Sequence, residues 1–390
     1  MNYSKTRTAC YIGYIVQAVV NNFLPLLFVM FNTSYGLSYQ KLGALVLINF
    51  GIQLVTDIAS IKIVAKLGTK KAVILAHFLC ALGLALLGVL PRLFSDTFAG
   101  ICISVLFSAV GGGLIEVLIS PVMDRISGER GRGYMSFLHS FYCWGQILVV
   151  LLTTLAIYMF GIGSWIYLAF FWALIPFVNA FIFIKVPIVE DEPKESRTPL
   201  GKIIKTKSFL LLMVLMFAAG ASELAMAQWA STFAEQGLGL SKITGDLLGP
   251  CAFAFLMGAG RIIYALLPEK IGIRTVLLAC GFITLACYLV SSLVDNSIVA
   301  VCACALCGLG VSATWPGSYT LASKTFPHGG NAMFGILAMF GDLGASAGPW
   351  LAGLIAAAKG LRPALLLCGI FPLMLIVFLI LYRKNNINEV

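Results

Sequence analysis

Three carboxylates lie inside long apolar runs of the sequence. Glu116 is the one charged residue of GGGLIEVLISPV, residues 111–122, while Glu223 stands in GASELAMAQW and Asp342 in MFGDLGASAGPW. An acid at the centre of a membrane helix costs about 2.5–3.5 kcal/mol on insertion scales, and such acids usually have a function. Burial disfavours the charged form, so the group can bind and release a proton. We expect a proton-coupling role for all three; the alternative for each is a structural, permanently paired carboxylate.

Amide and aromatic side chains offer a way to bind a polar solute. Amides hydrogen-bond to hydroxyl groups, and aromatic faces stack on the C–H surface of a sugar ring. Many of the candidates are grouped at helical spacing along the chain. They are Gln17, Asn21, His139, Tyr142, Gln146, Gln228, Trp229 and Trp315. For the two tryptophans, packing between helices is the alternative role.

The elements that carry these side chains are membrane helices. The 390 residues are 60% apolar and 11% charged, with a mean hydropathy of +0.98, which excludes a soluble fold. A spanning helix needs about 20 mainly apolar residues. Twelve such runs are predicted, at 8–31, 39–62, 71–90, 97–122, 133–158, 165–186, 208–234, 244–267, 273–293, 297–321, 330–357 and 363–382. The runs are too long and continuous for the strands of a membrane barrel, so we expect an all-α membrane protein.

The chain divides into two halves that resemble each other. The polar segment 186–207 contains three prolines and predicts a cytoplasmic linker, 188–207, between a six-helix half at 1–187 and another at 208–390. Gly-Leu-Ser opens the second helix of each half, at 36–38 and 239–241, and a glycine follows at nearly equal spacing, Gly68 and Gly272. This internal symmetry is typical of a transporter built from parallel repeats.

Lysine and arginine set the expected orientation. Twenty of the 26 lie on the side of both termini, five lie on the other side, and Arg261 lies within a helix. Both termini are therefore expected in the cytoplasm, in a multi-pass protein of the cell (inner) membrane. The same bias explains the net charge of +10 without a nucleic-acid partner. The eleven cysteines have no metal-site spacing, so we expect no metal, cofactor or disulfide.

A short charged turn occurs once in each half. The second half has EKIGIR at 269–274, and the first half has AKLGTK at 65–70, with Ala65 in place of the acid. On this turn the sequence resembles the major facilitator superfamily, whose members carry an acidic-basic-x-Gly-x-basic loop. The resemblance implies two pseudo-symmetric six-helix bundles and alternating access at a central site.

The fourth apolar run adds a closer resemblance. Gly111, Gly113, Glu116 and Pro121 reproduce the Gly-x-Gly-x-x-Glu-x-x-x-Asn-Pro pattern of the fucose permease group of sugar:proton symporters, with Ser120 in place of the asparagine. The segments GLGVSATWPGSYTLAS, 308–323, and GASE, 220–223, are similar to further elements of that group. The resemblance implies proton-coupled import of a sugar or similar neutral polar solute by a protein expected to be a monomer in the lipid bilayer.

The first helix departs from that group. Fucose permease itself has a second acid there, whereas ACYIGYIVQAVVNNFLPLLFVMF has none and offers Gln17, Asn21 and Asn22. The coupling chemistry of the group therefore transfers only through Glu116. Sodium remains an alternative coupling ion, because carboxylate and hydroxyl oxygens could bind it equally well.

A second set of charges predicts a gate at the cytoplasmic side. Asp57 lies on a polar stripe of the second run, and Arg261 occupies the equivalent register of the second half. We assign to the gate Asp57, Arg261, Glu269, Lys270 and Arg274.

Other classes fit less well. A proton-driven multidrug or metabolite exporter of the same superfamily is the main alternative, but the fifth run, which carries Gly145, lacks the proline of an antiporter motif. A carrier of organic or amino acids needs a cation at the cavity centre, whereas Arg261 is expected near the cytoplasmic end. A channel lacks a filter sequence, and three scattered histidines predict no enzyme.

Overall fold

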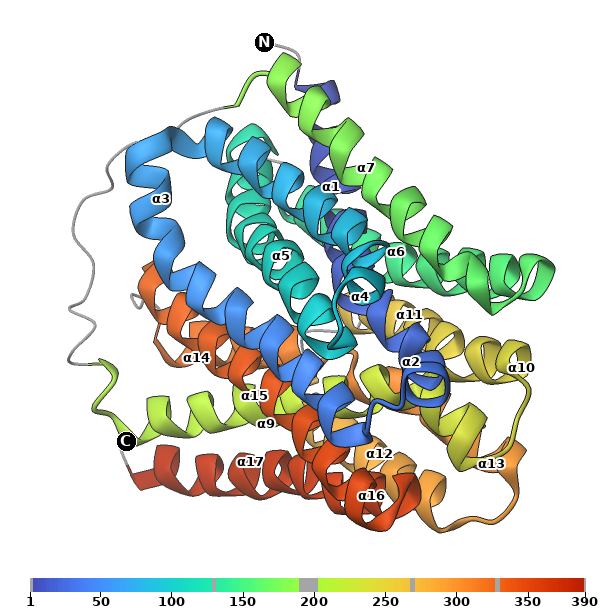
Figure 1. Cartoon of the computed structure of the whole chain (residues 1–390). Helices are drawn as coiled ribbons and strands as arrows, with labels where there is room; N and C mark the ends of the chain where they lie inside the picture. The colour runs from blue at the N-terminus through green and yellow to red at the C-terminus, as the bar shows by residue number, and fades with distance from the viewer. Residues whose placement is uncertain (1–2, 128–130, 189–202, 267–270, 327–329, 389–390) are drawn as a thin grey trace. The chain divides into compact units, whose positions relative to one another are not determined.

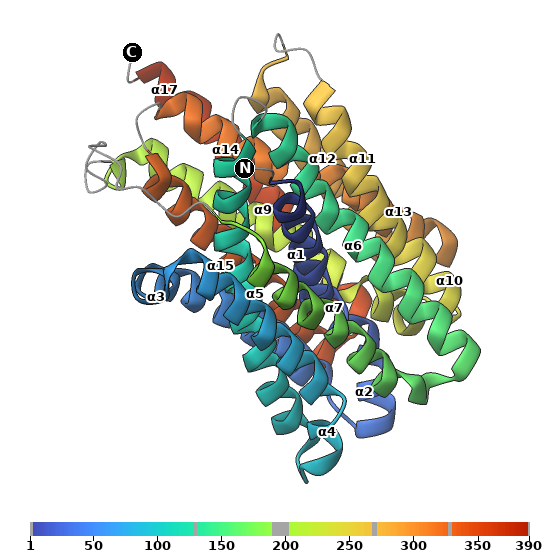
Figure 2. The ribbon, with the colours of Figure 1, turned by 90° about the horizontal axis from the view of Figure 1, so that it is seen from above.

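The fold is described from a computed structural model that covers residues 3–127, 131–188, 203–266, 271–326 and 330–388. In these residues all regular secondary structure is helical. The backbone divides into two compact units, Met1–Pro193 and Lys194–Val390. Figures 1 and 2 show the helices of each unit, which are described separately here. The predicted linker, 188–207, falls mostly on residues 189–202, outside the described residues.

Unit 1 begins with a helix that is interrupted once. Pro25 lies in a 3₁₀ turn that separates the first two α-helices, because proline cannot donate the backbone hydrogen bond that would continue the first. Its elements are α1 Ser4–Asn22, η1 Leu24–Leu27, α2 Phe28–Tyr35, α3 Tyr39–Leu87, α4 Leu90–Leu93, α5 Thr97–Ser127, α6 Gly131–Phe160, η3 Ile162–Ser164 and α7 Trp165–Lys185. Within α3, Gly68 has a left-handed φ of 75°, which divides the element into two membrane spans.

Three glycines bring the helices of unit 1 into close contact. The helix α5 packs on α3 and α1. A Cβ atom on Gly111 would lie 2.5 Å from the Ala76 carbonyl oxygen, and one on Gly113 would lie 3.0 Å from Cα of Gln53. The GGG segment therefore lets the backbone of α5 approach α3 directly, one turn before Glu116.

Unit 2 contains two π-helical turns, η4 Phe233–Gly237 and η5 Leu247–Cys251, which lie on either side of the short helix α10 Lys242–Asp246 in the sequence. They interrupt the predicted seventh and eighth spans. The elements are α9 Lys207–Thr232, η4 Phe233–Gly237, α10 Lys242–Asp246, η5 Leu247–Cys251, α11 Ala252–Leu266, α12 Ile273–Leu293, α13 Ser297–Val311, α14 Thr314–Thr325, α15 Gly330–Lys359, α16 Leu361–Cys368 and α17 Ile370–Asn388. Such π turns often mark functional sites.

The helices α9 and α15 cross with their backbones in contact. A Cβ atom on Gly220 would collide with the carbonyl oxygen of Gly341, and one on Gly344 would collide with that of Phe217. This crossing brings the backbone next to Glu223 and Asp342 together.

Eleven of the twelve predicted spans match helices of the expected length and hydropathy, in the expected order. Eleven helices among the described residues are long and apolar enough to cross a membrane. The remaining predicted run, 330–357, coincides with the 30-residue helix α15. The all-α fold is thus as expected, whereas the breaks within the first, seventh, eighth, tenth and twelfth spans were not predicted.

Candidate functional site

A chain of side-chain amides leads away from Glu116 in unit 1. The Gln17 Nε2 atom lies 2.9 Å from Glu116 Oε2 and 3.0 Å from Gln53 Oε1. In turn, Gln53 Nε2 donates to Asn21 Oδ1 at 2.8 Å, and Asn49 Nδ2 donates to the same oxygen at 3.2 Å. Helices α1, α3 and α5 each contribute to this chain, so three elements of the unit meet at one polar network.

The orientation of the Gln17 amide follows from its neighbours. An ionised Glu116 can only accept hydrogen bonds, so the amide must present its N–H₂ group to the carboxylate. Gln17 is 4% exposed, and its Oε1 atom is buried without a hydrogen-bond partner. A Cβ atom at Gly112 would lie 3.2 Å from this oxygen. A buried acceptor without a partner is costly, and this oxygen retains the capacity to accept a hydrogen bond from a donor such as a hydroxyl group.

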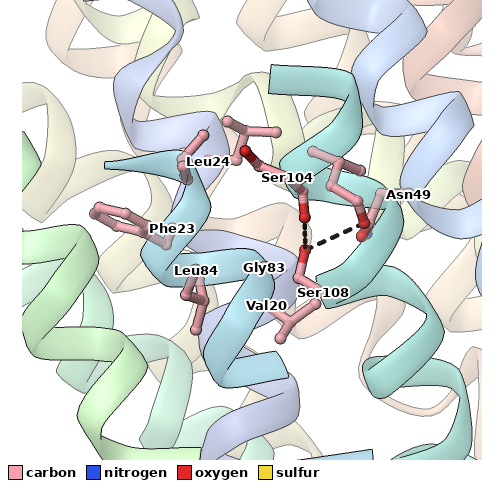
Figure 3. A pocket seen from close by; sticks show the side chains of 10 residues that line it. Val20, Phe23, Leu24, Asn49, Gly83, Leu84, Ser104 and Ser108 are labelled. Carbon is pink, nitrogen blue, oxygen red and sulfur yellow. Dashed lines mark hydrogen bonds between the residues drawn. The ribbon is translucent and has the colours of Figure 1, made fainter. Parts of the chain in front are cut away.

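The amide chain ends at a small cavity. Asn49 lines it together with Ser104 and Ser108 of α5, as Figure 3 shows, and the cavity has a volume of about 20 Å³. This volume is enough for one water molecule. The hydroxyl groups of both serines donate to backbone carbonyls of their own helix, so their lone pairs remain available as acceptors. The sequence prediction did not assign Asn49 to the binding site, although it belongs to the polar stripe on α3, and it did not single out the two serines that line the cavity.

The other unit 1 candidates gather around α1 and α6. Tyr142 on α6 accepts a hydrogen bond of 3.3 Å from Asn22. The ring of exposed His139 makes an edge contact of 5.1 Å with Tyr14. Gln146 is 2% exposed on the same helix. The structure therefore brings Gln17, Asn21 and Glu116 into one hydrogen-bonded network and places the α6 residues beside α1.

The two acids of unit 2 lie at the glycine crossing. Glu223 on α9 is 8% exposed, and Asp342 on α15 is 6% exposed. A Cβ atom on Gly341, the neighbour of Asp342, would collide with the indole ring of Trp315 on α14. The outer edge of the half-buried Trp315 ring therefore approaches α15 so closely that glycine is required there, next to Asp342.

Trp229 and Gln228 are buried on α9. Trp229 is 1% exposed, and its indole N–H donates to the carbonyl oxygen of Pro349 on α15 at 2.9 Å. This geometry makes Trp229 an anchor between two helices and favours its packing role. Gln228 is 2% exposed.

The predicted gating residues are only partly described. Glu269 and Lys270 lie outside the described residues. Arg274 Nε donates to the carbonyl oxygen of Leu379 at 2.9 Å, which ties α12 to α17. Arg261 on α11 is half-buried, and its Nη2 atom lies 3.8 Å from the sulfur of Met257. Asp57, which occupies the equivalent register in the first half, is half-buried on α3 of unit 1.

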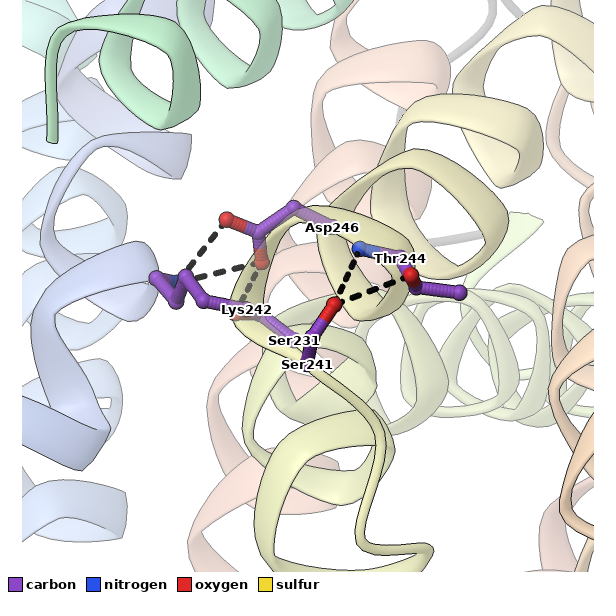
Figure 4. A network of polar contacts seen from close by, with 5 residues as sticks. All are labelled: Ser231, Ser241, Lys242, Thr244 and Asp246. Carbon is purple, nitrogen blue, oxygen red and sulfur yellow. Dashed lines mark hydrogen bonds and ion pairs between the residues drawn. The ribbon is translucent and has the colours of Figure 1, made fainter. Parts of the chain in front are cut away.

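Sequence reasoning missed a buried ion pair in unit 2. Lys242 Nζ lies 2.9 Å from Asp246 Oδ2 and 3.0 Å from the hydroxyl oxygen of Ser231. The same hydroxyl donates to Asp246 Oδ1 at 2.5 Å, and Figure 4 shows the closed triangle. Asp246 is 1% exposed. The i, i+4 spacing of Lys242 and Asp246 directly after the helix cap Ser241 was the signal that could have revealed it.

The sequence matches the family model of the Major Facilitator Superfamily over residues 10–333 and 251–388. The chain therefore belongs to this superfamily and is a multi-pass membrane transporter, not an enzyme. A search of the curated proteins finds no match.

Solved structures of transporters share the fold. A D-xylose-proton symporter has a TM-score of 0.80 at 12% identity, with 98% of both chains covered. The nucleoside transporter NupG has a TM-score of 0.77 at 11% identity, covering 96% of this chain and 99% of its own. The E. coli fucose:proton symporter has a TM-score of 0.66 at 17% identity, covering 98% and 99%. At these identities the likeness concerns the fold.

Proposed function

We propose that the protein is a proton-coupled secondary transporter that imports a sugar or a similar neutral polar solute by alternating access. The observation that carries this proposal is the amide chain that starts at Glu116. It joins a titratable group to neutral hydrogen-bonding groups on three helices, and one buried amide oxygen of Gln17 has no partner. The chain thus combines a proton acceptor with a binding point for a hydroxyl donor.

The amides give Glu116 a way to influence solute binding. When Glu116 is ionised, it accepts from the Gln17 N–H₂ group. When it is protonated, it gains an O–H donor, and the Gln17 amide can turn to present its oxygen instead. That turn would place two oxygens face to face between Gln17 and Gln53, so the Gln53 amide must turn as well. The protonation state of Glu116 is therefore transmitted to the amides that meet the solute.

The solute class follows from the groups that line this network. Within the amide chain the neutral side chains Gln17, Asn21, Asn49 and Gln53 outnumber the single acid. Neutral amides suit hydroxyl-rich solutes, and they lack the cation that an anionic solute needs. Two of the similar structures are sugar:proton symporters and one is a nucleoside transporter, which supports the same class. Both termini are proposed to be cytoplasmic, from the excess of lysine and arginine on their side.

A ligand-stabilisation screen tests this proposal. The purified protein is heated with a panel of sugars, nucleosides, organic acids and lipophilic cations, and a specific ligand raises the melting temperature in proportion to RT ln(1+[L]/Kd). We expect a sugar or nucleoside to stabilise the protein, and Gln17→Leu to remove that stabilisation. Stabilisation by organic acids would contradict the solute class, and stabilisation by lipophilic cations would favour the exporter.

A further inference from the structure

The repeated charged turn differs between the two halves at one acidic position, and in unit 1 a cavity lies next to the residue at that position. AKLGTK has Ala65 in the register where EKIGIR has Glu269. Next to Ala65, helices α3 and α5 enclose a cavity of about 370 Å³. Its walls are formed by two segments of unit 1 that are far apart in sequence: Ser60, Val64, Ala65 and Thr69 of α3, and Val117, Leu118, Pro121 and Arg125 of α5.

The side chains around this cavity combine one cation with an apolar wall. Arg125 carries the only formal charge among the described lining residues, and Ser60 and Thr69 supply two hydroxyl groups. A guanidinium group presents a planar set of donors that fits a carboxylate or phosphate. Val117 and Leu118 contribute apolar side chains to the same cavity wall as Arg125 on α5. The volume lies in the range of small-molecule pockets, which is about 300–1,000 Å³.

The backbone holds the cavity open at the molecular surface. Gly68 has a φ of 75°, which reverses the chain direction between Ala65 and the buried Thr69. Ala65 and Pro121 at the rim are exposed. The exposed lysines of the same stretch of α3 add positive potential around the opening; they are Lys62, Lys66 and Lys71.

We propose that this cavity binds an amphipathic anion, with a phosphate or carboxylate group on Arg125 and an apolar chain against Val117 and Leu118. An acidic phospholipid carries both parts, and so does a soluble anion with a short apolar tail. Basic pockets between membrane helices are known to hold lipid head groups. The proposal is separate from the solute site at Glu116 and would stand if transport of a sugar were disproved.

Ala65 offers a direct way to fill the site. A glutamate at this register, as in the second half, would extend a carboxylate from α3 into the cavity that Arg125 lines. It would occupy part of the volume and place a negative charge beside Arg125, so it should compete with an external anion. Glutamine has nearly the same size without the charge, which makes Ala65→Gln the matched control for Ala65→Glu.

The test measures the melting temperature of the full-length protein with three probes. These are phosphatidylglycerol, phosphatidylcholine and inorganic phosphate, each titrated into protein purified in the same detergent. We expect phosphatidylglycerol to raise the melting temperature in a saturable manner and phosphatidylcholine to have a smaller effect. Arg125→Gln should weaken the apparent affinity by about tenfold or more, as expected for loss of a charge-assisted hydrogen bond.

The variants separate the outcomes. Loss of the lipid effect in Ala65→Glu but not in Ala65→Gln supports the site even if Arg125→Gln fails to fold. Stabilisation by inorganic phosphate alone, with the same dependence on Arg125, supports the site and shows that soluble anions reach it. The proposal is overturned if neither anion stabilises the protein, or if Ala65→Glu and Ala65→Gln bind phosphatidylglycerol equally well.

Discussion

The buried ion pair of unit 2 should be important for its stability. Lys242→Met would leave the Asp246 carboxylate, which is 1% exposed, with the Ser231 hydroxyl as its remaining partner in the triangle. Breaking a buried ion pair by removing one partner costs about 3–5 kcal/mol. The side chain of Lys242 is 18% exposed, so we expect the lower end, about 3 kcal/mol. For a unit of this size that loss corresponds to a fall in melting temperature of about 6–12 °C.

A double-mutant cycle isolates the pair from other effects of the substitution. The unfolding temperatures of Lys242→Met, Asp246→Asn and the double variant are measured in the same detergent. Because Asp246→Asn removes the stranded charge, the double variant should be more stable than the sum of the single losses predicts, with a coupling of about 1–3 kcal/mol. Lys359→Met, at an exposed lysine of the same unit, is the control and should change little. Equal losses of stability in Lys242→Met and Lys359→Met, or additive losses in the cycle, would show that the Lys242–Asp246 pair does not stabilise the unit.

Three further predictions concern the site and the gate. Gln17→Leu removes the donor to Glu116 and Gln53 and should weaken solute binding by about tenfold or more; unchanged affinity in a titration would exclude Gln17 from the site. Trp315→Ala should weaken solute binding more than Trp165→Ala. Trp165 is 3% exposed and its ring centroid lies 5.6 Å from that of Phe31, so Trp165→Ala should instead lower the free energy of unfolding by about 3–5 kcal/mol. Equal effects of the two substitutions on binding would exclude Trp315 from the site. Asp57→Asn should favour the inward-open state without loss of binding, and unchanged cysteine accessibility from the cytoplasmic side would contradict the gate.

The helices could be predicted because each apolar run is long enough to cross a bilayer. Gly68 has a φ of 75° between two spans, whereas Gly272 precedes α12 as its N-cap with a φ of −59°, so their similar spacing in the sequence is not matched by a shared backbone conformation. The breaks inside spans were harder, since Pro25 is compatible with either a kinked helix or a 3₁₀ turn. The π turns around Asp246 depend on tertiary packing, which leaves no periodic signal in the sequence.

The polar network was only partly visible in the sequence. Helical spacing placed Gln17 and Asn21 on one face of α1, and the acid in the GGG segment singled out Glu116. Nothing in the sequence showed that Gln53 of α3 would lie between them, because this depends on the close approach that Gly113 allows.

The variant Glu116→Gln distinguishes a loss of proton coupling from a loss of solute transport. Glutamine keeps the size of the side chain, and its amide oxygen can still accept the 2.9 Å hydrogen bond from Gln17, but it cannot titrate. Both proteins are reconstituted in liposomes, and uptake driven by a pH gradient is measured beside counterflow exchange at equal solute concentrations.

We expect Glu116→Gln to abolish gradient-driven accumulation and to retain counterflow, because exchange requires no net proton movement. Undiminished uphill uptake by the variant would contradict the coupling role and transfer it to Glu223 or Asp342. Loss of both activities together with a lower melting temperature would also contradict it, since Glu116 would then be a structural brace of unit 1.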